Sequence, residues 1–141
     1  MSQLSAEYLT ELARQLGFVS AFLGGVAAAF VATLLTLRSP RRIVGRTIVC
    51  AAATAVAFII SVLGSLAWVA ILHPQSPSDP GGSAAREAQL LTAIPFTAGI
   101  ALLMVTIGMS GWIRSRTTGL GTTAVAVLGA ALALLATADW G

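Results

Sequence analysis

Few side chains in this 141-residue sequence carry catalytic or metal-binding chemistry, and they lie far apart. His73 is the only histidine and Cys50 is the only cysteine, so the sequence offers neither a cluster of Cys and His metal ligands nor a disulfide within the chain. No Ser–His–Asp arrangement, phosphate-binding loop or dinucleotide fingerprint occurs. We therefore expect no enzyme activity, no cofactor and no bound metal.

The long apolar stretches contain no charged residue either, because the eight basic and five acidic residues all lie outside them. The only polar side chains in their interiors are Ser, Thr and Cys50. Proton relays and ion sites within a membrane normally need a carboxylate, a histidine or a metal ligand at depth, so these functions are disfavoured. A passive pore lined by hydroxyls and carbonyls stays open as an alternative. Its lining would be Thr54, Ser61 and Ser65, or Thr92, Thr106 and Ser110.

Small side chains recur at alternating spacings of three and four residues. This spacing predicts close, left-handed packing of helices, and a pore-facing surface or chance in an alanine-rich chain are the alternatives. The first stripe is Gly17, Ala21, Gly24 and Ala28, the second is Cys50, Thr54, Ala57, Ser61 and Gly64, and the last is Thr122, Ala126, Gly129, Ala133 and Ala136. The larger side chains expected to face lipid or a partner are Phe22, Phe30, Phe58, Ile59, Ile60 and Leu63.

The composition indicates a membrane protein, since 57% of the residues are hydrophobic and only 9% are charged. A soluble domain usually carries about 25% charged residues. This balance excludes a soluble enzyme, a nucleic-acid-binding module and a disordered chain. Four apolar segments are long enough to cross a bilayer as helices. They cover about residues 17–37, 47–72, 88–112 and 120–138.

We therefore predict an all-α integral membrane protein, a single domain over residues 1–141 built as an antiparallel bundle of four transmembrane helices. Leu4, Tyr8, Leu12 and Leu16 recur every four residues near the N-terminus, which predicts a short amphipathic helix on the membrane surface or leading into the first span. The alternative is a polar turn that frays. The apolar run after it is too long for a cleaved signal peptide, so the first span should be retained. Pro95 lacks an N–H for the carbonyl of Leu91 and is predicted to kink the third helix.

The arginines predict the orientation of the chain. All basic residues are arginine, and six of the eight lie in two short segments without an acidic residue: Arg38, Arg41, Arg42 and Arg46 in the loop 38–46, and Arg114 and Arg116 in the loop 113–119. By the positive-inside rule these loops are cytoplasmic, and both termini and the loop 73–87 lie outside the cytoplasm of a bacterial inner (plasma) membrane. The arginines would also contact anionic lipid headgroups or an acidic partner. Trp68, Trp112 and Trp140 are expected in the interfacial belts.

These patterns favour a structural or accessory subunit of a homo-oligomer or of a larger membrane complex, with lipids and membrane subunits as its partners and no nucleic acid. The alternative function is a passive channel or a pore-forming effector built from the Ser, Thr and small-residue faces.

Overall fold

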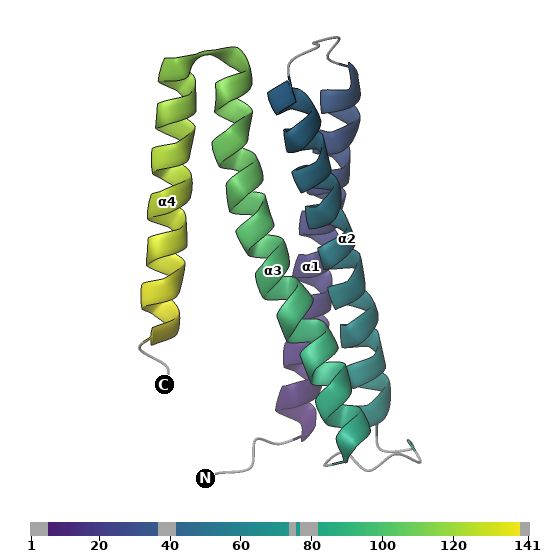
Figure 1. Ribbon diagram of the computed structural model, residues 1–141. Coiled ribbons are helices and arrows are strands. Elements are labelled where there is room, and N and C mark those ends of the chain that lie inside the picture. Colours follow the sequence, from purple (N-terminus) through teal and green to yellow (C-terminus); the bar gives the residue numbers. More distant parts are fainter. Residues whose placement is uncertain (1–5, 37–41, 74–75, 77–81, 139–141) are drawn as a thin grey trace. The chain divides into compact units, whose positions relative to one another are not determined.

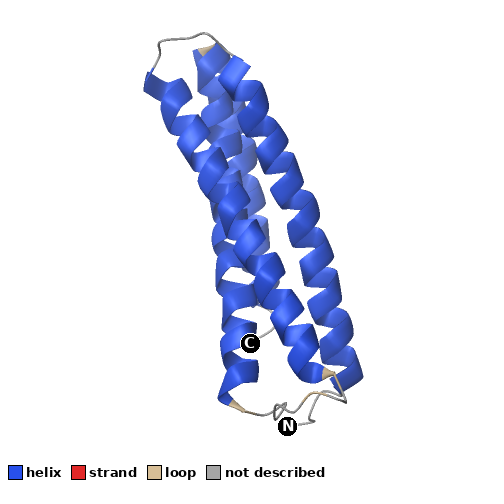
Figure 2. Ribbon diagram, turned by 90° about the vertical axis from the view of Figure 1, so that its right-hand side faces the viewer, coloured by secondary structure: helices blue, strands red, loops and turns tan. Residues whose placement is uncertain are grey.

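The computed structural model describes residues 6–36, 42–73, 76 and 82–138, and the side chains of residues 7–131 within these ranges. The described chain forms four antiparallel helices: α1 (Ala6–Thr36), α2 (Arg42–Leu72), α3 (Ser83–Arg114) and α4 (Arg116–Ala138) (Figure 1). The described residues outside the helices are His73, Ser76, Gly82 and Ser115 (Figure 2). The predicted all-α, antiparallel four-helix arrangement is confirmed.

Three of the helices are long and apolar enough to cross a membrane. They are the segments Glu7–Thr36, Arg42–Leu72 and Ser83–Arg114, of 30, 31 and 32 residues. Each is well above the roughly 20 residues that a bilayer requires. The fourth helix is shorter, with 23 residues, and is C-terminal. The chain therefore has the helices of a multi-pass membrane protein.

The N-terminal segment forms a helix that leads into the first span, which is one of the two arrangements that the sequence predicted. The first helix starts at Ala6 and continues without a break to Thr36, so residues 6–16 extend the first span. Part of its apolar face is covered by the protein: Ala13 is fully buried in a cluster with Trp68, and Leu9 and Leu16 pack against that cluster. Tyr8 is exposed. Leu4 lies outside the described residues.

At the connections the helices extend beyond the predicted spans. The third helix begins at Ser83, five residues before the predicted span 88–112. The only residue between α3 and α4 is Ser115, where the sequence suggested a loop over 113–119. The Ser115 hydroxyl accepts a hydrogen bond from the backbone N–H of Thr118 at 3.1 Å, which is the geometry of an N-cap. This cap explains how α4 starts directly after α3 ends.

The chain divides into two compact units, which are described separately. The first unit consists of Met1–Val26 and Ala55–Ala98, and the second consists of Ala27–Thr54 and Gly99–Gly141. The first unit thus holds the N-terminal part of α1, the C-terminal part of α2 and the N-terminal part of α3. The second unit holds the remaining parts of these three helices and all of α4.

Buried side chains follow a seven-residue period along the helices. On α2, nine buried positions are spaced alternately by three and four residues: Val44, Thr47, Ala51, Thr54, Phe58, Ser61, Ser65, Trp68 and Leu72. Ala55 and Gly64 are buried next to this stripe. On α1 the buried residues Ala13, Ser20, Ala27 and Leu34 are each seven apart. This period keeps one stripe of each helix facing its neighbours when helices coil around one another with a left-handed twist.

Gly64 marks the closest approach of two helix backbones in the first unit. A Cβ atom built on Gly64 would lie 2.7 Å from the carbonyl carbon and oxygen of Leu91 and 2.8 Å from the amide nitrogen of Thr92. These neighbours are backbone atoms of α3, so they have no flexible end that can turn aside. Only glycine fits at this point of α2 without moving one helix.

The variant Gly64→Ala should therefore lower the free energy of unfolding by about 1–3 kcal/mol, the usual effect of overpacking. Gly121→Ala is the matched control, because a Cβ on Gly121 meets nothing within 4 Å. We expect the control to change stability by less than about 0.5 kcal/mol. Thermal unfolding of the two purified variants in the same detergent, followed by circular dichroism, measures the difference. Equal stability of both variants would contradict the close approach.

Candidate functional site

Three hydroxyl-bearing residues meet in the interior of the first unit and are named here the hydroxyl cluster: Ser20 on α1, Ser61 on α2 and Thr92 on α3. All three are fully buried. The Ser61 hydroxyl donates to the backbone carbonyl of Thr92 at 3.0 Å, and the Oγ atoms of Ser20 and Ser61 are 3.1 Å apart. The hydroxyl cluster therefore links three helices through one side chain, that of Ser61.

The direction of these hydrogen bonds follows from the number of protons. A serine hydroxyl has one proton to donate. Because Ser61 uses its proton on the Thr92 carbonyl, Ser20 must be the donor to Ser61. The Thr92 hydroxyl donates to the Ala88 carbonyl of its own helix at 2.9 Å. Among the described residues, no buried side-chain nitrogen or oxygen lacks a hydrogen-bond partner, so the hydroxyl cluster leaves no donor for a ligand.

Pro95 lies one turn beyond the hydroxyl cluster, inside an unbroken α3. As a proline it has no N–H to give to the carbonyl of Leu91, four residues earlier. The carbon and oxygen of that same carbonyl are the atoms that a Cβ built on Gly64 would meet most closely. Ser61, one turn before Gly64, donates to the next carbonyl of α3, that of Thr92. The segment of α3 that the proline weakens is thus the segment against which α2 packs.

Phe58 is part of this interior, where the sequence suggested a lipid-facing residue. Its side chain is fully buried, and its ring meets that of Phe96 edge to face, with the centroids 6.1 Å apart. A Cβ on Gly24 would lie 3.2 Å from the Cβ of Phe58, so the glycine makes room for the aromatic residue. The expected outward position was wrong because, in lipid, an apolar side chain gains nothing by facing outward rather than inward.

Trp68 is also turned inward. It is 5% exposed and lies in the cluster with Ala13, Leu72 and Ala88, so its ring packs against protein near the end of α2. Trp112 differs, since its ring is 39% exposed. Trp140 lies outside the described residues. Of the two described tryptophans, Trp112 is therefore the more exposed.

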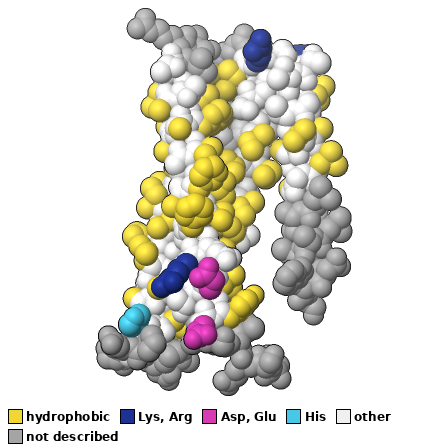
Figure 3. All heavy atoms as spheres, turned by 180° about the vertical axis from the view of Figure 1, so that it is seen from behind, with side chains coloured by type: hydrophobic (Ala, Val, Ile, Leu, Met, Phe, Trp, Pro, Cys, Tyr) yellow, Lys and Arg dark blue, Asp and Glu magenta, His cyan; other side chains and the backbone are white. Residues whose placement is uncertain are grey.

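A polar hollow lies at one end of the first unit. Glu7, Glu11, Arg14 and His73 line it together with Thr10, Val69 and Leu72. Figure 3 shows acidic, basic and histidine side chains gathered near this end of the face in view (Figure 3). Within the described ranges no group of three His, Cys, Asp or Glu side chains is placed to hold a metal ion. The hollow therefore has the polar character of a surface at the edge of a membrane.

In the second unit, α3 and α4 form a tight hairpin. A Cβ on Gly111 would collide with the Thr122 hydroxyl and lie 2.6 Å from the Thr118 carbonyl. The Thr122 hydroxyl is 3.1 Å from the Gly108 carbonyl of the other helix. A Cβ on Gly119 would lie 2.6 Å from the ring of Trp112. Glycines and one threonine thus hold the two backbones close together next to the turn.

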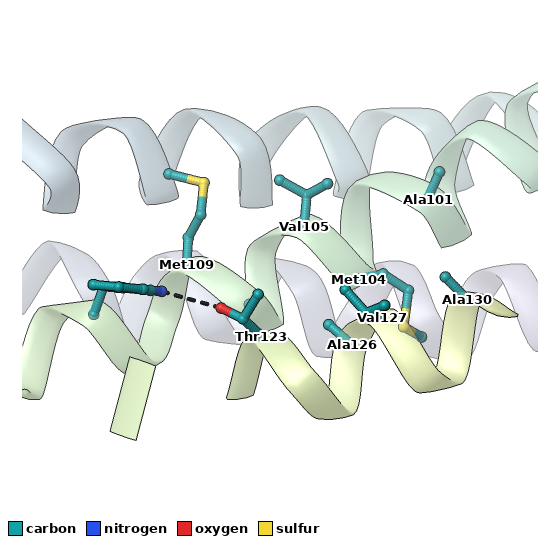
Figure 4. Close-up of a pocket in the computed structure, with 10 residues that line it drawn as sticks. Ala101, Met104, Val105, Met109, Thr123, Ala126, Val127 and Ala130 are labelled. Carbon is teal, nitrogen blue, oxygen red and sulfur yellow. Dashed lines mark hydrogen bonds between the residues drawn. The ribbon is translucent and has the colours of Figure 1, made fainter. Parts of the chain in front are cut away.

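An open groove, named here the α3–α4 groove, runs along this hairpin (Figure 4). Its volume is about 480 Å³. At one end the indole N–H of Trp112 donates to the Thr123 hydroxyl at 3.1 Å. Side chains from both helices line the groove: Ala101, Met104, Val105, Gly108, Met109, Trp112, Thr123, Ala126, Val127 and Ala130.

The structure places the predicted small residues in different environments. On α1, Gly24 is buried and Gly17 is half-buried, whereas Ala21 and Ala28 are exposed. A Cβ on Gly17 would lie 2.5 Å from the Ser65 hydroxyl. The packed stripe of α1 instead passes through Ser20 and Ala27, one residue away from the predicted positions. On the other helices the buried members of the predicted stripes are Thr54, Ser61, Gly64 and Ala126, and the half-buried ones include Ala57 and Gly129. The side chains of Ala133 and Ala136 lie outside the described part.

The predicted arginine positions are exposed wherever the structure describes them. These are Arg42, Arg46, Arg114 and Arg116, whereas Arg38 and Arg41 lie outside the described residues. Ser20 was not among the predicted site residues, and the signal that could have identified it is its seven-residue spacing from Ala13 and Ala27.

Comparisons with protein-family models, with curated proteins and with solved structures found no match to this chain. Its function is therefore argued from its own geometry.

Replacing Ser61 with alanine should destabilise the first unit, because both interhelical hydrogen bonds of the hydroxyl cluster are lost. Such bonds contribute about 0.6 kcal/mol on average in membrane proteins, so we expect a loss of roughly 0.5–1.5 kcal/mol. Thr97→Ala is the control, since the exposed Thr97 bonds only to the Ala93 carbonyl of its own helix. Unfolding of the purified variants in mixed detergent micelles measures both effects.

A double-mutant cycle of Ser20→Ala and Ser61→Ala isolates the contact between these two residues. If the two hydroxyls are hydrogen-bonded, the free energy of unfolding should fall less in the double variant than the sum of its decreases in the two single variants. Strict additivity would show that the two hydroxyls do not interact.

Proposed function

We propose that this chain is a structural or accessory subunit of a membrane complex, assembled with copies of itself or with other membrane subunits, and that it is not an enzyme. The observation that carries the proposal is a second small-residue face, on the outer side of α1. Ala21, Gly25, Ala28, Ala29 and Ala32 are all exposed. A Cβ on Gly25 meets nothing within 4 Å, so its own chain leaves this position open.

The spacing of this outer face suits helix association. Ala21, Gly25 and Ala29 are each four residues apart, the spacing at which small residues let two transmembrane helices approach closely. The inner stripe of α1 already packs within the chain through Ser20, Gly24 and Ala27. The outer face is therefore available to a helix of another subunit.

The buried hydroxyls support a subunit better than a pore. Thr54, Ser61, Ser65, Thr92 and Thr106 are at most 2% exposed. Their hydroxyls bond to carbonyls of the same chain, as those of Thr54 and Thr106 do to Cys50 and Leu102 at 2.8 Å. A pore would need these groups in contact with water. The alternative function, a passive channel or a pore-forming effector, would thus require the helices to separate.

We further propose that the chain lies in a bacterial inner (plasma) membrane as four spans, with α4 as the fourth. Three features lie at the same end of the second unit (Figure 1). They are the C-terminal end of α1, the N-terminal end of α2 and the turn between α3 and α4. Arg42, Arg46, Arg114 and Arg116 belong to these helix ends. The positive-inside rule then favours a cytoplasmic position for this side, with both termini outside the cytoplasm.

Gly25→Leu should reduce self-association, because a bulky side chain would keep the outer α1 faces of two copies apart. The fold should be unaffected, since the Cβ position of Gly25 is open within the chain. Gly121→Leu is the matched control, with an equally open Cβ position on α4. Native mass spectrometry of the purified proteins in mild detergent gives the stoichiometry.

The proposal requires that Gly25→Leu shift the complex to smaller species while Gly121→Leu leaves it unchanged. Recovery of the unaltered chain only as a lone monomer, without any partner from its source membrane, would contradict the subunit proposal. Steady conductance of the purified protein in planar bilayers would favour the pore instead.

The proposed orientation predicts opposite results for two reporter fusions. A reporter active only outside the cytoplasm should be active after Gly141 and inactive when inserted at Gly45, within the arginine-rich side. A reporter active only in the cytoplasm provides the reciprocal control. Activity of the first reporter at both positions would overturn the four-span topology.

A further inference from the structure

We propose that the α3–α4 groove binds one acyl chain of an anionic phospholipid, whose phosphate lies against Arg114 and Arg116. The inference rests on the proposed embedding of α4 in the membrane. It does not depend on the proposed accessory role or on self-association.

The walls of the groove suit hydrocarbon and not a polar solute. Apart from Trp112 and Thr123, every side chain that lines it is apolar. The polar atoms of those two residues are bonded to each other, because the indole N–H donates to the Thr123 hydroxyl. The volume of about 480 Å³ falls within the roughly 300–1,000 Å³ typical of small-molecule sites. Met104 and Met109 add flexible side chains that adapt to an occupant without a rigid shape.

The length of the groove matches one leaflet of a bilayer. From Trp112 to Ala101 it covers eleven helical steps of α3, or about 16 Å at 1.5 Å per residue. Half of a hydrocarbon core about 30 Å thick is about 15 Å. If the exposed Trp112 lies at the interface, the other end reaches the bilayer midplane, where an acyl chain of one leaflet also ends.

The charges at the Trp112 end complement a phosphate. Arg114 is the last residue of α3 and Arg116 is the first of α4, and both are exposed. The described residues of the second unit include no Asp or Glu, so neither arginine has a carboxylate partner there. The two cations follow Trp112 by two and four residues in the turn of the hairpin, so an apolar groove that ends at Trp112 fits an amphiphile with an anionic head.

A second copy of the chain fits the groove less well. Copies inserted in the same orientation would bring their own arginines to the same side of the membrane, and like charges in close contact repel. A transmembrane helix would also extend through both leaflets, whereas the described groove covers only one.

Native mass spectrometry tests the proposal on the full-length protein. The protein is reconstituted in nanodiscs that contain equal amounts of phosphatidylglycerol and phosphatidylcholine, and is then released in mild detergent. We expect one retained phosphatidylglycerol per chain. Each surface arginine contributes about fivefold to the binding of an anionic lipid, so Arg114→Gln combined with Arg116→Gln should lower phosphatidylglycerol retention roughly 25-fold.

Two controls separate this site from general attraction to the basic side. Arg42→Gln combined with Arg46→Gln removes the same charge from the same unit, but from α2 and not from the hairpin of α3 and α4, and should change retention less than about twofold. Ala101→Leu combined with Ala130→Leu fills the groove and should lower retention of both lipids, whereas Ala124→Leu, on the exposed side of α4, should not.

Four results would overturn the proposal. They are the absence of any retained lipid, equal retention of the two lipids, equal effects of the two arginine pairs, and disulfide cross-linking of two copies through Ala130→Cys in a Cys50→Ser background. The last result would identify a second copy as the occupant. Extraction of the protein from membranes without detergent would instead refute the membrane embedding itself.

Discussion

The fold depends on how closely helix backbones can approach when the surroundings offer neither hydrogen bonds nor a hydrophobic driving force. Lipid tails are as apolar as leucine, so burying leucine between helices gains little, and association relies on tight contact and on hydrogen bonds between helices. The interior of this chain fits that requirement. Among the largest fully buried side chains of the described residues, Phe58 is the only apolar one, and the others are threonines and serines. Large apolar groups such as Phe18 and Phe22 are exposed instead, at 76% and 64%.

The buried hydroxyls act in two ways that follow from their chemistry. Thr47, Thr54, Thr92 and Thr106 donate to the carbonyl four residues earlier in their own helix, so they pack as small residues without an unsatisfied donor. Ser61 instead donates across to α3 and accepts from Ser20. It does so where Gly64 has already brought the two backbones together, one turn away. Close packing thus creates the distance at which the interhelical hydrogen bonds form.

The sequence predicted the long helices because an uninterrupted apolar run has only one way to satisfy its backbone in lipid. The packed face of α1 was harder to predict. Ala21 and Ala28 belong to a small-residue stripe, but so do Ser20 and Ala27 one residue earlier, and in an alanine-rich helix small size does not separate two faces about 100° apart. What distinguishes the faces is the partner: Ser20 meets Ser61, and Gly24 meets Phe58. Phe58 was expected to face outward for a related reason, since hydrophobicity does not indicate inward or outward orientation in a membrane.

The same physical constraint explains why the hairpin of α3 and α4 leaves a groove. Next to the turn, Gly108, Gly111 and Gly119 carry no side chain, so the helices come close, with the Trp112 ring against Gly119 and Thr122 against Gly111. Farther along, the facing residues are alanines such as Ala101 and Ala130, which are too small to fill the space beside the contact, and Met104, whose sulfur would lie 3.5 Å from a Cβ on Gly129. A soluble protein would lose stability by leaving such apolar walls uncovered. In a membrane, lipid can fill them, and this difference is the physical basis of the proposed binding of an anionic phospholipid in the groove.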